Sequence, residues 1–233
     1  MHVVTRALIA AFLLAVAACA PEYADDRFVG IARALHPSVV LLSMRVPPEH
    51  KSDRYDDAFA TGVVIASGSW GSDILTVAHA VDGAWNMHAT IDNREKVPAR
   101  VIALDKDLDI ALVRTNRRGL APATLGSSRD LSNQLGRDVA LLGYPIPDEF
   151  EDEELGLATS IITGRLSSVR KGAIELTLPI VPGESGAPIF IMDTGEIIGI
   201  AESRFDDEHS IGFALPIDDA KRFLHRVDTV HGF

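Results

Sequence analysis

Short apolar runs, separated by turn residues at close intervals, place the strongest limit on how this chain folds. The runs are rich in Val, Ile, Leu and Ala, and Gly, Asp, Asn, Ser or Pro stands between them. This spacing favours antiparallel β-barrels over a sheet that alternates with helices. The expected strands are 61–66, 73–78, 97–104, 110–115, 138–143, 160–167, 173–178, 189–192, 197–202 and 210–215, preceded by a β-rich segment at 38–44.

Two helices are expected outside the strand pattern. Apolar residues recur at helical spacing over 28–35, and Pro37 ends that pattern. A closing amphipathic helix is expected from Pro216 onward, with Asp218 near its N-cap. The segment 118–133, which is rich in Gly, Pro and Ser, is the expected boundary between two lobes.

The N-terminus has the features of a bacterial export signal. His2 and Arg6 precede the apolar run 7–20, which is too short to cross a bilayer but suits the core of a signal peptide. The run ends in Val-Ala-Ala-Cys, which resembles the lipobox of bacterial lipoproteins. We therefore expect a signal peptide over 1–18, lipidation and membrane anchoring at Cys19, and a linker over 19–27.

Cys19 also limits the disulfide chemistry and the destination of the protein. It is the only cysteine, so no disulfide can form within the chain. Ala20 stands where an aspartate would signal retention in the inner membrane, which favours the outer membrane and a periplasmic site of action. The alternative is a plain secretory signal cut nearer Ala20, which would release a soluble periplasmic or secreted protein.

The charge pattern excludes a nucleic-acid binder and gives no sign of a cofactor. The formal net charge is -11 and no run of five basic residues occurs, so the positive surface that nucleic acids require is missing. No spaced-ligand pattern for a metal ion is present, and neither a metal nor a cofactor is expected. The acidic stretch 148–154 is expected to be a solvated loop, or alternatively a filter that favours cationic substrate segments.

A turn of small residues carries the candidate nucleophile. The hexapeptide from Gly183 to Pro188 holds Ser185 between two apolar runs. Glycine lets the backbone bend sharply and leaves the amides of Gly183 and Ser185 free to converge on a developing oxyanion. Ordinary tight turns share this pattern, so the assignment requires a base and an orienting carboxylate elsewhere.

His79 and Asp109 are the candidates for these two roles. His79 follows an apolar strand, where packing can hold the imidazole while the ring faces a cleft. Asp109 directly precedes the apolar strand 110–115, and a carboxylate there can fix the imidazole tautomer and stabilise the imidazolium. Asp105 and Asp107 are rivals, but they stand further from the strand and are expected in its solvated turn.

The three segments together resemble one protease class. His79, Asp109 and Ser185 occur in the chain order of chymotrypsin-like proteases, in the local sequences Thr-Val-Ala-His, Asp-Ile-Ala-Leu and Gly-Glu-Ser-Gly-Ala-Pro. More narrowly, residues 28–233 resemble the protease domain of the HtrA/Deg family of trypsin-like serine proteases. Further segments that carry the resemblance are 36–40, 62–65, 142–145, 163–167, 195–200 and 211–216.

The resemblance implies both a fold and an activity. The fold is two antiparallel six-stranded β-barrels of the chymotrypsin type with short N- and C-terminal helices. The activity is that of a serine endopeptidase acting on polypeptides. His79 would be the general base, Asp109 its orienting acid, Ser185 the nucleophile, and the Gly183 and Ser185 amides the oxyanion hole. The resemblance leaves the oligomeric state open.

Two other functional classes compete with this interpretation. A catalytically silent, protease-like scaffold that binds peptides or a partner protein would keep the same fold, since fold and motif do not guarantee activity. An α/β-hydrolase would need Gly-x-Ser-x-Gly, but Ala187 replaces the second glycine and the strand pattern opposes a doubly wound sheet.

The chain departs from the family pattern in three places. Glu184 stands before the serine, where Asn or Asp is usual, and Ala187 replaces a glycine. Only 17 residues follow Pro216, so no PDZ domain is expected. No activation site of the Arg-Ile-Val-Gly-Gly type is visible that would give Glu184 a new N-terminus to pair with.

By the same resemblance, the floor of the substrate pocket lies about six residues before the nucleophile, and no aspartate stands there. The expected pocket residues are Pro179, Ala201, Glu202, Ser203, Ile211, Gly212 and Phe213. A buried basic side chain would lack a counter-charge, so we expect small or medium aliphatic residues to be preferred. Glu202 is the one group that could accept a cation, if its carboxylate turned into the pocket.

Overall fold

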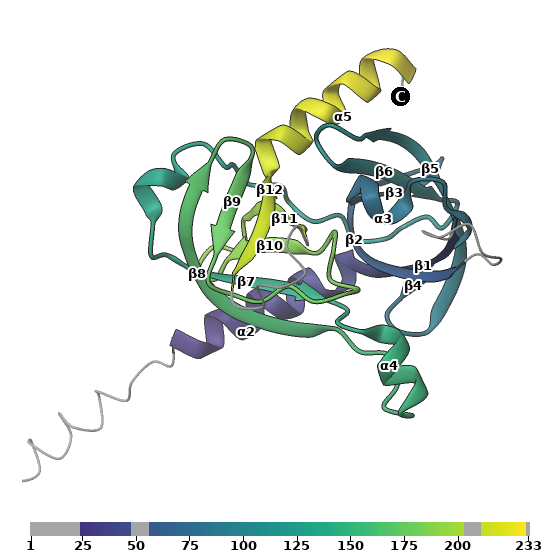
Figure 1. The fold of residues 1–233 in the computed structure, drawn as a ribbon, viewed down its shortest axis with the longest axis horizontal. Helices are drawn as coiled ribbons and strands as arrows, with labels where there is room; N and C mark the ends of the chain where they lie inside the picture. Colours follow the sequence, from purple (N-terminus) through teal and green to yellow (C-terminus); the bar gives the residue numbers. More distant parts are fainter. Residues whose placement is uncertain (1–23, 48–55, 203–210, 232–233) are drawn as a thin grey trace, which may run out of the picture.

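The computed structural model describes residues 24–47, 56–202 and 211–231 (Figure 1). The expected signal peptide, Cys19, most of the expected linker and Ser203 lie outside the described residues.

In the part of the chain that the structure describes, twelve strands form two closed antiparallel barrels, which confirms the predicted fold class (Figure 1). The order in the first barrel is β1 (Val39–Val46), β2 (Asp56–Gly68), β3 (Gly71–Thr76), β6 (Ile110–Thr115), β5 (Glu95–Asp105) and β4 (Trp85–Ile91). The order in the second barrel is β10 (Pro188–Ile191), β11 (Ile197–Glu202), β12 (Gly212–Pro216), β9 (Ala173–Leu176), β8 (Ser160–Arg170) and β7 (Asp138–Gly143).

Two features of the first barrel differ from expectation. β4 was not expected, because Asn86 and His88 interrupt its apolar residues and Asn86 has a positive φ of 52°. The expected strand over 73–78 ends at Thr76, and the residues after it form the short helix α3 (Ala78–Val81). His79 therefore lies on a helical turn and not at the end of a strand.

Helices cover the outside of the barrels. α2 (Ala24–Leu35) is followed by a 3-10 turn, η1 (His36–Ser38), and packs the ring of Phe28 on that of Phe190 with centroids 6.3 Å apart. α5 (Ile217–His231) closes the chain, as expected. The other helices are η2 (Leu131–Gln134) and α4 (Pro147–Asp152), which the sequence analysis took for part of a loop. Among the described residues, no helix combines the length and apolar character needed to span a membrane.

Apolar side chains fill each barrel and also the seam between the barrels. On β1, Val40 and Leu42 point into the first barrel, while Leu41 points the other way, toward the seam. The seam cluster brings together Leu75 of the first barrel and Phe190 of the second, and Phe223 of α5 packs against it. Burial of each large side chain contributes roughly 1.5–3 kcal/mol to the stability of the fold. Because strands of this kind are covered on both faces, their sequences are nearly continuous apolar runs.

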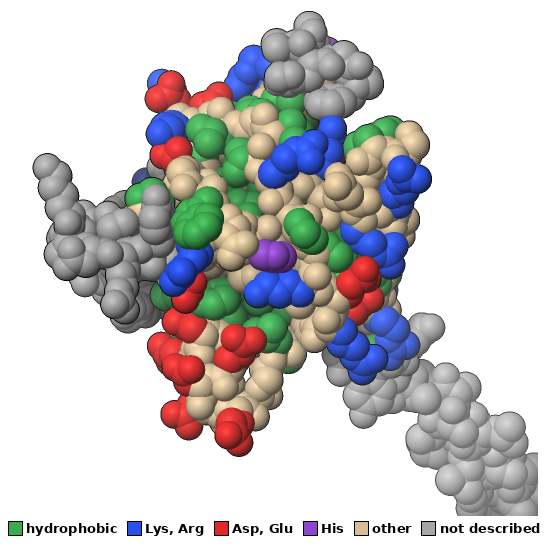
Figure 2. All heavy atoms as spheres, turned by 90° about the vertical axis from the view of Figure 1, so that its right-hand side faces the viewer, with side chains coloured by type: hydrophobic (Ala, Val, Ile, Leu, Met, Phe, Trp, Pro, Cys, Tyr) green, Lys and Arg blue, Asp and Glu red, His purple; other side chains and the backbone are tan. Residues whose placement is uncertain are grey.

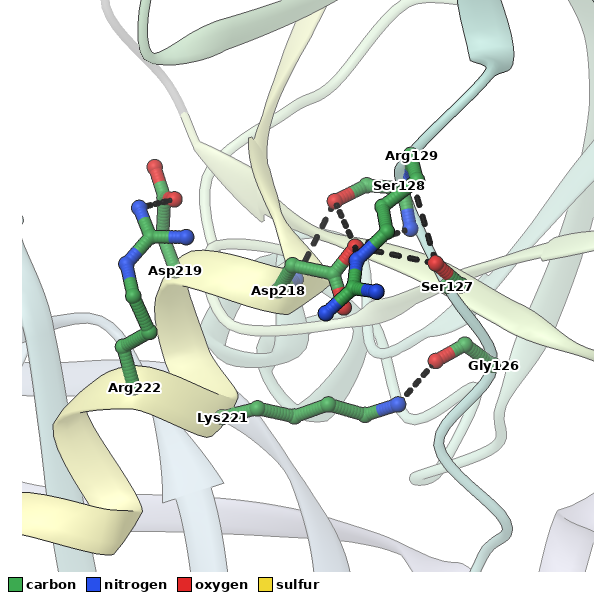
Figure 3. A network of polar contacts seen from close by, with 8 residues as sticks. All are labelled: Gly126, Ser127, Ser128, Arg129, Asp218, Asp219, Lys221 and Arg222. Carbon is green, nitrogen blue, oxygen red and sulfur yellow. Dashed lines mark hydrogen bonds and ion pairs between the residues drawn. The ribbon is translucent and has the colours of Figure 1, made fainter.

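The connection between the barrels is fastened to the start of α5 (Figure 3). Asp218 accepts hydrogen bonds from the hydroxyl of Ser127 (2.9 Å) and the backbone N–H of Ser128 (2.9 Å). In return, the Ser128 hydroxyl accepts the backbone N–H of Asp218 at 3.1 Å. Burial raises the pKa of Asp218, but these hydrogen bonds and the charge of Lys221 outweigh it and lower the pKa overall. The carboxylate thus stays ionised at a helix N-terminus, where negative charge is favourable.

Thr61 of β2 makes the central polar contact between the barrels. Its backbone N–H donates to the carbonyl of Ser185 (2.9 Å), and its hydroxyl donates to the carbonyl of Gly183 (2.8 Å). The same hydroxyl accepts the backbone N–H of Tyr144 at 3.0 Å. On the other side, the hydroxyl of Thr76 donates to the Thr61 carbonyl at 2.8 Å. Thr61 is fully buried, so these bonds replace water completely.

We predict that Thr61→Val destabilises the protein while Thr61→Ser does not. Valine keeps the shape of the side chain but leaves the Gly183 carbonyl and the Tyr144 N–H buried without a partner, at about 1–3 kcal/mol each. Serine keeps the hydroxyl and serves as the matched control. Chemical denaturation should give a loss of roughly 2–6 kcal/mol for valine. Equal stability of the two variants would contradict the assigned role of the hydroxyl.

Candidate active site

Two glycines give the turn that carries Ser185 its shape. Gly183 has a φ of +89° and Gly186 a φ of +91°, values that residues with side chains rarely adopt. A Cβ atom on Gly186 would lie 2.1 Å from the carbonyl oxygen of Thr61, and one on Gly183 would lie 2.4 Å from that of Tyr144. Only glycine fits at these two positions, because backbone atoms of neighbouring segments approach so closely.

Neighbouring hydrogen bonds fix the orientation of the two amides expected to form the oxyanion hole. The carbonyl of Pro182 accepts the N–H of Ile146 at 2.7 Å, and the carbonyl of Glu184 accepts the N–H of Ala187 at 2.9 Å. In a trans peptide the N–H points opposite to the carbonyl. The N–H groups of Gly183 and Ser185 therefore point away from these partners, which leaves them able to bind an oxyanion.

Glu184 folds back onto its own turn and is fully buried. Its Oε2 accepts the N–H of Val181 at 2.9 Å, and its own N–H donates to the Val181 carbonyl at 3.1 Å. Burial raises the pKa of Glu184 to about 7, although the hydrogen bond from Val181 opposes the shift. The longer acid at this position therefore closes the turn from inside.

His79 and Asp109 meet through two hydrogen bonds. Oδ2 of Asp109 lies 2.6 Å from Nδ1 of His79, and Oδ1 accepts the backbone N–H of the same histidine at 2.7 Å. Asp109 adopts a left-handed backbone conformation, with a φ of +53°, which turns its side chain toward α3. The contact fixes both the tautomer and the direction of the imidazole, whose side chain is 45% exposed.

The pKa values of the pair move in opposite directions. The hydrogen bond to Asp109 raises the pKa of His79 and outweighs burial, which lowers it. Burial raises the pKa of Asp109, but the hydrogen bonds from His79 outweigh it and lower the pKa overall. The carboxylate is therefore charged and the imidazole is a strengthened base.

The rival acid Asp105 has a different role. Its Oδ1 accepts the backbone N–H groups of Asp107 and Leu108, both at 3.1 Å. Its Oδ2 pairs with Arg226 of α5 at 2.6 Å. Asp105 thus shapes the turn before β6 and leaves Asp109 as the acid that contacts His79.

Hydrogen bonds of Thr61 connect the turn that carries Ser185 with the segment that leads to His79. Thr61 holds the Ser185 carbonyl, and Thr76, three residues before His79, holds Thr61. Among the described residues, the Ser185 hydroxyl makes no hydrogen bond to His79, and such contacts commonly tighten only when substrate binds. Sequence reasoning missed Thr61 and Thr76, because a threonine in an apolar strand is usually read as a packing residue.

The expected pocket residues lie around β11 and β12. Ala201 and Gly212 are buried, Pro179 and Phe213 are partly buried, and Ile211 is exposed. A Cβ atom on Gly212 would lie 3.0 Å from Cδ1 of Ile180, a residue that the sequence analysis did not select. An apolar side chain therefore lies beside this glycine.

Glu202, the one expected pocket residue with a charge, lies at the end of β11. It is buried, with 5% of the residue exposed. Among the described residues, no group of three or more His, Cys, Asp or Glu side chains could hold a metal ion.

Comparison with known proteins agrees with this geometry. The family model "Trypsin-like peptidase domain" matches residues 60–200. The chain is 29% identical over 191 residues to "Probable periplasmic serine endoprotease DegP-like" of Halomonas elongata, covering 76% of this chain and 37% of the relative. It is 27% identical over 182 residues to "Serine protease Do-like HtrA" of Bacillus subtilis, covering 73% and 39%. The chain thus spans about two-fifths of the length of these relatives.

A solved structure shares the fold. "HtrA-type protease AlgW with tripeptide" superposes with a TM-score of 0.68 at 21% identity, over 86% of this chain and 63% of that chain. The two six-stranded barrels and the match of the family model over most of both barrels lead to one assignment. The chain belongs to the trypsin-like peptidase domain family, and HtrA-type serine proteases are among its relatives.

Proposed function

We propose that the chain is a serine endopeptidase that cleaves polypeptides through an acyl-enzyme intermediate. The observation that carries this proposal is the double hydrogen bond between His79 and Asp109, together with the turn that holds Ser185 between two glycines of positive φ. A carboxylate in such a contact orients the imidazole and stabilises its charged form. The names of the relatives point to the same activity.

The mechanism follows from the arrangement of these groups. His79 takes the proton of the Ser185 hydroxyl as the oxygen attacks the scissile carbonyl, and the imidazolium is stabilised by Asp109. The negative charge on the tetrahedral intermediate is held by the amides of Gly183 and Ser185. His79 then gives its proton to the leaving amine, and a water molecule activated by the same base releases the acyl group from the serine.

Variants of the triad test this proposal on a denatured protein substrate. Ser185→Ala should abolish turnover, and Asp109→Asn should lower kcat by about four orders of magnitude, because the amide no longer fixes the imidazole tautomer. Asp107→Asn, in the same turn but exposed, is the matched control and should keep the wild-type rate. Turnover that survives in Ser185→Ala would refute the mechanism. A folded wild type without turnover would favour the silent scaffold.

The protein is further proposed to be exported and anchored by a lipid on Cys19, with residues 1–18 removed as the signal peptide. The lipobox supports this proposal, and the DegP-like relative is named as periplasmic. The anchored domain would begin near residue 28, after a linker that starts at Cys19.

Labelling with a fatty-acid analogue in a bacterial host tests the anchor. The wild type should incorporate the label and sediment with membranes, whereas Cys19→Ser should do neither, because the lipid is added to the thiol. Equal labelling of the two proteins would exclude lipidation at Cys19. Release of unlabelled wild type as a soluble protein would favour the plain secretory signal.

The substrate pocket is proposed to accept small or medium aliphatic side chains. Ile180 lies beside Gly212, and Pro179, not an aspartate, stands at the expected floor of the pocket. An unpaired basic side chain buried there would cost several kcal/mol, whereas an aliphatic one contributes roughly 1–3 kcal/mol.

A peptide-library digest read by mass spectrometry tests the specificity. Cleavage should occur mainly after Val, Ala or Leu, since these side chains fit an apolar pocket without a charge. Ile180→Asp, which supplies a carboxylate beside Gly212, should raise the share of cleavage after Lys and Arg. Cleavage mainly after Lys or Arg in the wild type would show that the pocket is not apolar.

A further inference from the structure

α5 reaches from the second barrel to the hairpin turn that carries Asp109. The helix follows directly on β12 and runs toward β5 and β6 of the first barrel (Figure 1). Phe223 packs into the seam cluster between the barrels. Three residues later, the guanidinium of Arg226 donates a hydrogen bond to Oδ2 of Asp105, the last residue of β5, at 2.6 Å. α5 therefore joins the barrel of Ser185 to the turn of Asp109.

Asp105 holds this turn with its other carboxylate oxygen. Oδ1 accepts the backbone N–H groups of Asp107 and Leu108, both at 3.1 Å. Residues 106–109 form the turn that closes the hairpin of β5 and β6, so both bonds lie inside it. Arg226 and the turn are thus connected through one carboxylate, which bonds the helix with one oxygen and the turn with the other.

The backbone of Asp109 needs such support. Its φ of +53° lies in the left-handed region, which a residue with a side chain keeps only where its surroundings hold it. The turn is tied to α3 through Lys106, which pairs with Asp82 at 2.5 Å, and to α5 through Asp105. Because Oδ2 of Asp109 lies 2.6 Å from Nδ1 of His79, a small displacement of the turn lengthens that contact.

We propose that Arg226 is a positioning residue of the candidate active site. It fixes the carboxylate of Asp105, and the capped turn in consequence directs Asp109 toward His79. This inference rests on the proposed peptidase function, to which it adds α5 as a second link between the barrels beside Thr61. The Arg226 side chain is 54% exposed, and an exposed ion pair changes an equilibrium by a factor of a few. Arg226 therefore adjusts the rate of a site that functions without it.

A double-mutant cycle on kcat tests the proposal with a denatured protein as substrate. Arg226→Ala should lower kcat about two- to fivefold with little change in KM, because the base that activates the serine is less well oriented. Asp105→Asn keeps the Oδ1 acceptor for the turn but removes the charge that Arg226 binds, so it should cause a similar loss. The double variant should be no slower than the slower single variant, because both changes break the same contact.

Two further variants separate positioning from a general effect of charge on α5. Arg226→Lys keeps the charge and should recover most of the rate. Arg222→Ala, one turn earlier, removes an exposed arginine that pairs with Asp219 of α5 itself, and it should keep the wild-type kcat. A wild-type kcat in Arg226→Ala, or losses that add in the double variant, would overturn the proposal.

A second measurement does not depend on turnover: NMR titration of the His79 ring in the Ser185→Ala background. The hydrogen bond to Asp109 raises the pKa of His79, so a less firmly held Asp109 should move the midpoint of the titration to lower pH in Arg226→Ala. Arg222→Ala should leave the midpoint unchanged. A wild type without turnover whose His79 midpoint shifts in this way would refute the peptidase proposal and support the role of Arg226. An active enzyme whose midpoint is the same in Arg226→Ala would do the reverse.

Discussion

The hydrogen bonds of Thr61 hold together the two halves of the candidate site. His79 and Asp109 belong to the first barrel and Ser185 to the second, and each barrel has its own packed core. The relative position of these side chains therefore depends on the seam between the barrels. Thr61 is the polar centre of that seam, because one residue bonds the turn around Ser185 and, through Thr76, the segment that leads to His79. The apolar cluster around it excludes water and strengthens these bonds.

Glu184 is buried beside this seam, at the turn that carries Ser185. Glu184 has a pKa raised to about 7 by burial and accepts one backbone hydrogen bond. Since the folded protein holds this proton more tightly than the unfolded chain, its loss as the pH rises toward 7 weakens the fold. Asn or Asp is usual before the nucleophile in this family, and the longer side chain of Glu184 reaches back to Val181, where it closes the turn.

The sequence predicted the parts of the molecule that depend on local patterns. The bounds of β6, β7 and β11 agree with expectation, because these strands are buried on both faces and read as continuous apolar runs. β4 was missed because Asn86 and His88 break its pattern, and the acidic stretch after Pro147 was taken for a loop although α4 begins there. Acidic side chains gather around α4 at the edge of the molecule (Figure 2). The contacts of Thr61 and Ile180 could not be predicted, since each depends on a partner more than twenty residues away.

Labelling of the purified domain with a fluorophosphonate probe tests most directly whether Thr61 and the two barrels assemble an activated serine. The account predicts a single covalent adduct on Ser185, found by mass spectrometry. Its rate of formation should rise with pH as His79 loses its proton, at a pH above the usual range of histidine, because Asp109 raises the pKa of the imidazole. A folded wild-type domain that forms no adduct, or one whose adduct lies on another serine, would contradict the account.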